Sequence, residues 1–79
     1  MNLYRISQNT NNGYDTYDSA VVCADDERDA RSIHPSAFAE FGDTFSSWCS
    51  SPDEVTVRLV GVAAEGIERG VVCASFNAG

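Results

Sequence analysis

Four side chains in this sequence could act as a nucleophile or as its base: Cys23, Cys49, Cys73 and His34. A catalytic thiol needs a neighbouring base, and histidine is the side chain that ordinarily titrates near neutral pH. The sequence contains no glycine-rich phosphate loop, no nucleophile elbow and no pair of histidines. A pairing of Cys49 with His34 stays open, because sequence alone does not place the two together. With that exception, we expect that the protein is not an enzyme.

The same residues do not form the pattern of a metal or disulfide site. Three cysteines is an odd number, their spacing is wide, and no C-x-x-C motif is present. Cys23 and Cys73 each follow two valines, a context typical of a small buried hydrophobic side chain. Cys49 lies beside Trp48 and is expected to be the most exposed thiol. The lone His34 is expected to cap or pack, so we predict no metal and no cofactor.

Carboxylates are the most abundant charged groups. Twelve acids face five bases, all of them arginine, for a formal net charge of −7. This excess disfavours nucleic acid and anionic membranes as direct partners, because proteins bind both through cationic contacts. It favours a basic protein surface as the partner, or it serves only to keep the chain soluble.

The candidate partner-binding surface joins the densest acidic segment to the residues that lead into it. A rigid helix start would fix the carboxylates and lower the ordering cost of binding. The carboxylates could then compete with DNA phosphate for a groove lined by lysine and arginine. The alternatives are that the acids only cap and solubilise the helix, and that the tyrosines shield the edge of a small core. The predicted surface comprises Tyr14, Asp15, Tyr17, Asp18, Asp25, Asp26, Glu27 and Asp29.

A strand followed directly by a helix positions these residues. Residues 19–24 form an apolar run with two valines, which predicts a central strand. Asp25 or Asp26 is expected to cap the helix that follows. Pro35 disfavours helical geometry in the residue before it, so the helix is expected to end there. The predicted inward face of the helix comprises Ala30, Ile33 and His34.

Three further strands are predicted at residues 3–7, 55–62 and 71–76 from alternating apolar positions. In the first of these strands, Leu3 and Ile6 are expected to be buried. The last two strands are expected to pair as a hairpin, because turn signals separate them. The predicted fold is a single α+β domain over residues 1–79, with the order β-β-α-β-β. Its four-stranded antiparallel sheet carries the helix and an aromatic-rich segment on one face.

The aromatic-rich segment has a helical spacing of three, four and three residues, interrupted by a glycine and an aspartate. We expect one broken helix or a helical turn within a loop. Such rings are costly to leave in water, so they either cover one face of the sheet or dock a partner. The aromatic residues are Phe38, Phe41, Phe45 and Trp48.

Composition also bears on location. No apolar run approaches the roughly 20 residues that a membrane span needs. The first residues lack the charged, apolar and small-residue order of a secretory signal. We therefore expect a cytoplasmic protein. A monomer is favoured, although the sequence leaves the oligomeric state open.

Four stretches of the chain are similar to a family of small uncharacterised phage and prophage proteins. The resemblance covers most of the chain, and it implies no mechanism and no site residues. The stretches are residues 1–8 (Met-Asn-Leu-Tyr-Arg-Ile-Ser-Gln), residues 12–22, Ile33-His34-Pro35 and residues 70–79.

In size, acidity and lack of catalytic residues the chain also resembles the small anti-CRISPR proteins that act on type I systems. This resemblance implies a stoichiometric inhibitor that works in the host bacterial cell. Such an inhibitor binds a Cas subunit and blocks the binding of target DNA, in this case as a DNA mimic. The alternative is a virion or host-takeover accessory protein without catalytic activity.

Overall fold

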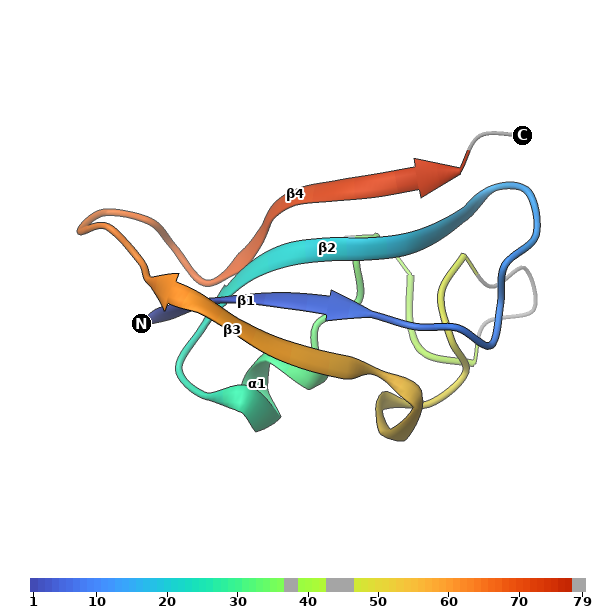
Figure 1. Cartoon of the computed structure of the whole chain (residues 1–79), viewed down its shortest axis with the longest axis horizontal. Coiled ribbons are helices and arrows are strands. Elements are labelled where there is room, and N and C mark those ends of the chain that lie inside the picture. The colour runs from blue at the N-terminus through green and yellow to red at the C-terminus, as the bar shows by residue number, and fades with distance from the viewer. Residues whose placement is uncertain (37–38, 43–46, 78–79) are drawn as a thin grey trace.

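A computed structural model of the chain describes residues 1–36, 39–42 and 47–77. Within these residues four strands form one antiparallel sheet, accompanied by one short α-helix (Figure 1). This confirms the predicted α+β fold with a four-stranded antiparallel sheet. In chain order the elements are β1 (Asn2–Ser7), β2 (Thr16–Ala24), α1 (Glu27–Arg31), the 3-10 turn η1 (Pro52–Glu54), β3 (Thr56–Val62) and β4 (Gly70–Asn77).

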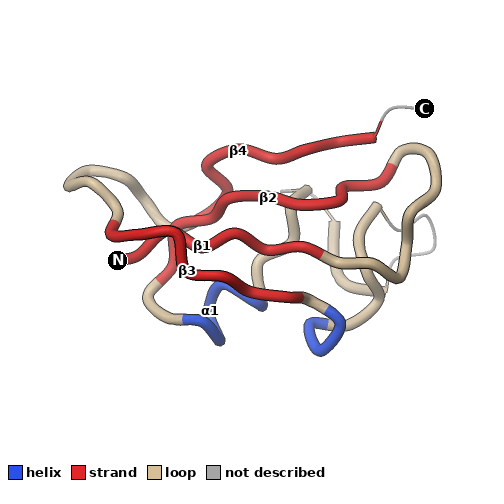
Figure 2. The backbone as a smooth tube through the Cα atoms, in the orientation of Figure 1, coloured by secondary structure: helices blue, strands red, loops and turns tan. Residues whose placement is uncertain are grey.

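The strands lie in the order β3-β1-β2-β4, so the predicted hairpin of the last two strands is wrong. β3 pairs with β1 and β4 pairs with β2, on opposite edges of the sheet. Residues 63–69 carry the chain between these edges (Figure 2). The glycine turn signals in this segment are real, since Gly66 and Gly70 both have positive φ. These glycines show where the chain turns but not which strand it joins next. The central β1–β2 pair has two free edges, and β3 pairs with one while β4 pairs with the other.

Helix α1 begins at the predicted place but is shorter than predicted. The Asp26 carboxylate caps it by accepting a hydrogen bond from the Asp29 N–H at 2.8 Å. The helix ends at Arg31, not before Pro35. Ser32 ends it, because both its N–H and its hydroxyl donate to the Asp29 carbonyl, at 3.2 and 2.7 Å. A side-chain hydroxyl that takes a helix carbonyl in this way competes with the next helical turn.

The core lies between one face of the sheet and the layer formed by α1 and the chain after it. Trp48 is the largest fully buried side chain. Tyr4 and Ile6 enter the core from β1, whereas Leu3 is only half-buried, so the prediction of a buried Leu3 is wrong. Successive strand residues point to opposite faces, which places Leu3 on the outer face. The remaining core residues are Ala20, Val22, Ala24, Ala30, Ile33, Cys49 and Val55.

The predicted aromatic segment covers the sheet where the structure describes it. Trp48 is buried and Phe41 packs against the core cluster. Phe38 and Phe45 lie outside the described residues. Residues 39–42 and 47–51 form turns and bends, so the described part of this segment contains no helix.

The covering layer leaves much of the two outer strands exposed. Every residue of β4 after Gly70 is exposed, as are most residues of β3. Large apolar side chains therefore remain in solvent on both edges, with Val62 of β3 at 81% exposed and Phe76 of β4 at 47%. Unpaired strand edges of this kind are open to pairing with another chain.

Candidate functional site

The eight residues predicted to bind a partner lie in two separate groups. We call Tyr14, Asp15, Tyr17 and Asp18 the loop cluster, and Asp25, Asp26, Glu27 and Asp29 the helix-start cluster. Tyr17 and Asp18 lie near the start of β2, and residues 19–24 of the same strand separate Asp18 from Asp25, which corresponds to about 23 Å of extended chain. The structure therefore does not bring the two clusters together into one acidic surface.

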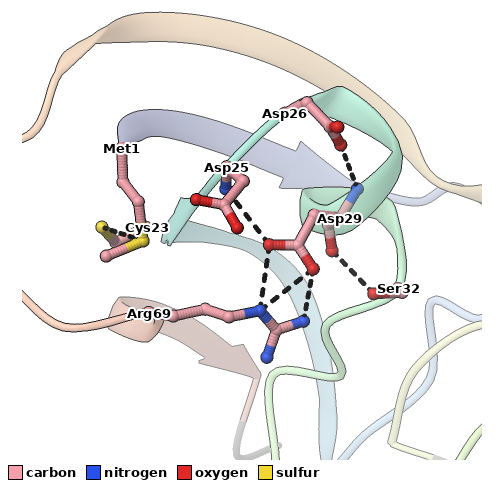
Figure 3. A network of polar contacts seen from close by, with 7 residues as sticks. All are labelled: Met1, Cys23, Asp25, Asp26, Asp29, Ser32 and Arg69. Atoms are coloured by element: carbon pink, nitrogen blue, oxygen red, sulfur yellow. Dashed lines mark hydrogen bonds and ion pairs between the residues drawn. The ribbon is translucent and has the colours of Figure 1, made fainter.

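Asp29 of the helix-start cluster is engaged within the protein. Arg69 donates to its two carboxylate oxygens, with Nε at 3.0 and 2.9 Å and Nη2 at 2.7 Å (Figure 3). The N–H of Asp25 donates to the same carboxylate at 3.1 Å. The hydrogen bond from Arg69 holds the pKa of Asp29 below its ordinary value, although partial desolvation opposes this effect. The charge of Asp29 is thus balanced inside the molecule.

The other three members of the helix-start cluster are exposed. One oxygen of Asp26 caps α1, so its side chain is held in place. Glu27 forms a 3.3 Å ion pair with Arg31, one helical turn away, and pairs of this exposed type are weak. Arg31 also donates to the Val55 carbonyl and so ties α1 to the residue before β3. Exposed carboxylates therefore sit on a backbone that several contacts hold fixed.

The two tyrosines of the loop cluster differ in exposure. Tyr14 is 78% exposed. Tyr17 packs against the core, and its ring meets Phe76 edge to face with centroids 4.7 Å apart. Tyr17 therefore shields the core edge, the alternative that the sequence left open, while Tyr14 remains accessible. A hydrogen bond with the Ser75 hydroxyl is the main cause of a lowered pKa of the neighbouring Asp18.

The exposure of two cysteines is the reverse of the prediction. Cys49 is buried and Cys73 is exposed, whereas Cys23 is buried as expected. Cys49 belongs to the core cluster, and burial raises the pKa of its thiol, with the charge of Glu54 adding to this rise. A thiol with a raised pKa is a poor nucleophile at neutral pH. Cys73 is exposed because it lies on the edge strand β4 in the outer-face row of Arg5 and Val21.

His34 has a packing role in the structure. Its Nδ1 accepts a hydrogen bond from the Ser36 N–H at 3.0 Å. Its ring also meets Phe41 edge to face, with centroids 5.6 Å apart. Within the part of the chain that the structure describes, no group of three His, Cys, Asp or Glu side chains could hold a metal ion.

The surface has shallow hollows that do not gather a nucleophile and a base. One of about 400 Å³ lies where β2 begins and β4 ends, and Asp18 is its one charged lining residue. Another of about 310 Å³ borders His34, with Glu40 and Arg69 also in its lining but no cysteine. These linings suit weak polar contacts better than covalent chemistry.

Two features were missed by the sequence-based prediction. Arg69 was not assigned a role, and its partner Asp29 lies 40 positions away in the sequence. No local pattern could have linked these two residues. Arg5 and Arg58 were also read as ordinary strand positions, although the sheet places them directly opposite each other.

Comparison with known proteins found no matching family model, no matching curated protein and no matching solved structure. Among the described helices, none has the length and apolar character needed to cross a membrane.

Proposed function

We propose that this protein is a non-catalytic, stoichiometric inhibitor that binds a basic surface of another protein. The observation that carries the proposal is the set of exposed carboxylates held at the fixed start of α1. Asp26 caps the helix and Asp29 binds Arg69, so these two residues hold the segment in place. Asp25 and Glu27 stay exposed and present negative charge to a partner.

This arrangement favours competition with DNA phosphate. A preorganised segment loses little conformational freedom on binding, so more of its contact energy appears as affinity. Each carboxylate paired with a lysine or arginine of the partner also removes one phosphate contact from that groove. The net charge of −7 adds long-range attraction toward a cationic surface.

In its specific form, the proposal is an anti-CRISPR protein of a phage or mobile element. It acts in the cytoplasm of the host bacterium, on a Cas subunit of a type I complex, and blocks binding of target DNA. Support for this form comes from the resemblance to small phage and prophage proteins and from the acidic character of the chain. The loop cluster, through Tyr14, Asp15 and Asp18, would contact a second part of the same partner.

The experiment is a pull-down with purified type I Cas subunits over a series of salt concentrations. We expect binding that weakens steeply with salt and is lost in the double variant Asp25→Lys, Glu27→Lys. The matched control is Glu65→Lys, Glu68→Lys, which changes the net charge equally at two exposed residues of another segment. Circular dichroism should show that all three proteins are folded. Binding that is insensitive to both salt and the helix-start variant would reject DNA mimicry.

A second candidate is a virion or host-takeover accessory protein. The open edge of β4 favours it, since this eight-residue strand carries no Asp, Glu, Lys or Arg and no proline. Such an edge can add to the sheet of another subunit. Co-purification with particle proteins, lost in the edge variant Val72→Lys but kept in Asp25→Lys, Glu27→Lys, would favour this candidate over the inhibitor.

A further inference from the structure

The sheet face opposite the helix carries a compact group of hydrogen-bond donors. Tyr4 and Ile6 point into the core, so the alternation of β1 places Arg5 and Ser7 on the outer face. The pairing of β1 with β3 sets Arg58 opposite Arg5 and Thr56 opposite Ser7. We call these four residues the outer-face block: two guanidinium groups with two hydroxyl groups beside them.

The two arginines of the block are exposed and have no acidic partner in the part of the chain that the structure describes. Arg31 and Arg69, by contrast, each form an ion pair. Like charges directly opposite each other on a sheet destabilise it. Two such arginines in a chain with twelve acids therefore leave an uncompensated positive site on an otherwise acidic molecule.

The residues of β2 and β4 that lie in line with Arg5 and Arg58 across the sheet are not carboxylates. Val21 of β2 lies opposite Arg5, and Cys73 of β4 lies opposite Val21. A hollow of about 190 Å³ borders Arg5 along this row. The nearest carboxylate along β2 is that of Asp18, which accepts a hydrogen bond from Ser19 at 3.1 Å. A bound anion would therefore sit on the β1–β3 side, away from Asp18.

We propose that the outer-face block binds the phosphate group of a small phosphomonoester. A phosphomonoester carries between about −1.5 and −2 charges at neutral pH and has three strong acceptor oxygens. Two guanidinium groups balance that charge and can each donate two parallel hydrogen bonds, while Ser7 and Thr56 add hydroxyl donors. The hollow beside Arg5 has room for the remainder of a small molecule. A nucleic acid is disfavoured, because the net charge of −7 repels a polyanion.

If the same arginines had a purely structural role, the experiments would give a different result. Their aliphatic stems could cover the half-buried Leu3 and Val21 on this face. In that case, substitution would change the free energy of unfolding and phosphate would produce no saturable effect. The proposal does not depend on the inhibitor function, because the outer-face block and the helix-start cluster share no residue.

The test is an NMR titration of the full chain with inorganic phosphate and then glycerol 3-phosphate, with sodium chloride holding the ionic strength constant. We expect saturable shifts centred on residues 5, 7, 56 and 58. Arg5→Gln and Arg58→Gln should each weaken binding tenfold or more, because each removes charge-assisted hydrogen bonds to the phosphate oxygens. The matched control is Arg28→Gln, which removes the same charge from an exposed arginine of α1.

Three results would overturn the proposal: shifts that do not saturate, shifts centred elsewhere, or equal weakening in the Arg28→Gln control. Urea unfolding of each variant separates loss of binding from loss of fold. If Arg5→Gln does not fold, Arg58→Gln on the edge strand β3 decides the question alone.

Discussion

The guanidinium of Arg69 and the carboxylate of Asp29 meet through three hydrogen bonds across 40 positions of sequence. Arg69 ends the segment that crosses from β3 to β4, and Asp29 lies in α1. The contact therefore fastens the edge-to-edge connection to the helix. Cys23 adds a weaker contact to the same connection, since its thiol lies 3.8 Å from the Ile67 carbonyl oxygen.

The substitution Asp29→Asn should destabilise the protein modestly. It removes the charge but keeps the shape of the side chain and an oxygen that can accept from the Asp25 N–H. The side chains of Arg69 and Asp29 are 49% and 24% exposed, so solvent screens the pair. We expect a loss of about 0.5–1 kcal/mol in the free energy of unfolding, measured with urea. Glu27→Gln, which breaks a looser pair, is the control and should cost less; an equal or larger cost would contradict the prediction.

The contribution of Asp29 should depend on pH in a definite direction. Its pKa in the folded state is lowered from an ordinary value of 3.8 by Arg69. The unfolded chain therefore binds the proton first as pH falls, so the stabilisation is fully present well above pH 3.8 and is lost progressively as the pH falls from there through the lowered pKa of the folded state. Urea midpoints of the native protein and of Asp29→Asn should differ at pH 6 and approach each other as the pH is lowered below 3.8. A difference that stays constant over this range would contradict the assignment.

The three thiols should react at very different rates. Cys73 is exposed, whereas Cys23 and Cys49 are buried. Ellman's reagent should therefore label one thiol quickly in the folded protein and all three in denaturant. Cys73→Ser should abolish the fast phase, whereas Cys49→Ser should leave it intact. A fast phase that survives in Cys73→Ser would contradict the assignment of Cys73 as the exposed thiol.

Trp48 should be the most sensitive single position in the core. It is fully buried in a small domain, and removal of a buried tryptophan costs about 3–5 kcal/mol. Since the hydrophobic core of a domain of this size rarely supplies more than about 3–5 kcal/mol, Trp48→Ala is expected to unfold most of the protein at room temperature. Trp48→Phe keeps much of the volume and should retain the fold. Circular dichroism and urea unfolding of the two variants measure the difference, and a fully stable Trp48→Ala would refute the assigned burial.

The sequence by itself determined the local elements of this protein. Alternation of side chains located three of the strands, an apolar run over residues 19–24 located most of β2, and the aspartate before α1 identified its cap, because each signal depends on residues only a few positions apart. The end of α1 was harder to predict. The Ser32 hydroxyl stops the helix three residues before Pro35, the residue that the pattern favoured.

Only the tertiary structure decided which strands became neighbours. The strand order determines the pairing of the two arginines, the exposure of Cys73 and the free edge of β4. Turn residues between β3 and β4 indicate that the chain bends there. Which strand β4 pairs with depends on hydrogen bonds to β2, a strand distant in the sequence. By placing β3 beside β1, the sheet brings Arg5 opposite Arg58. By placing β4 on the far edge, whereas α1 packs against β1, β2 and β3, the sheet exposes Cys73 and leaves a strand edge free. Cys49 is buried because it lies beside Trp48 in the layer that covers the sheet.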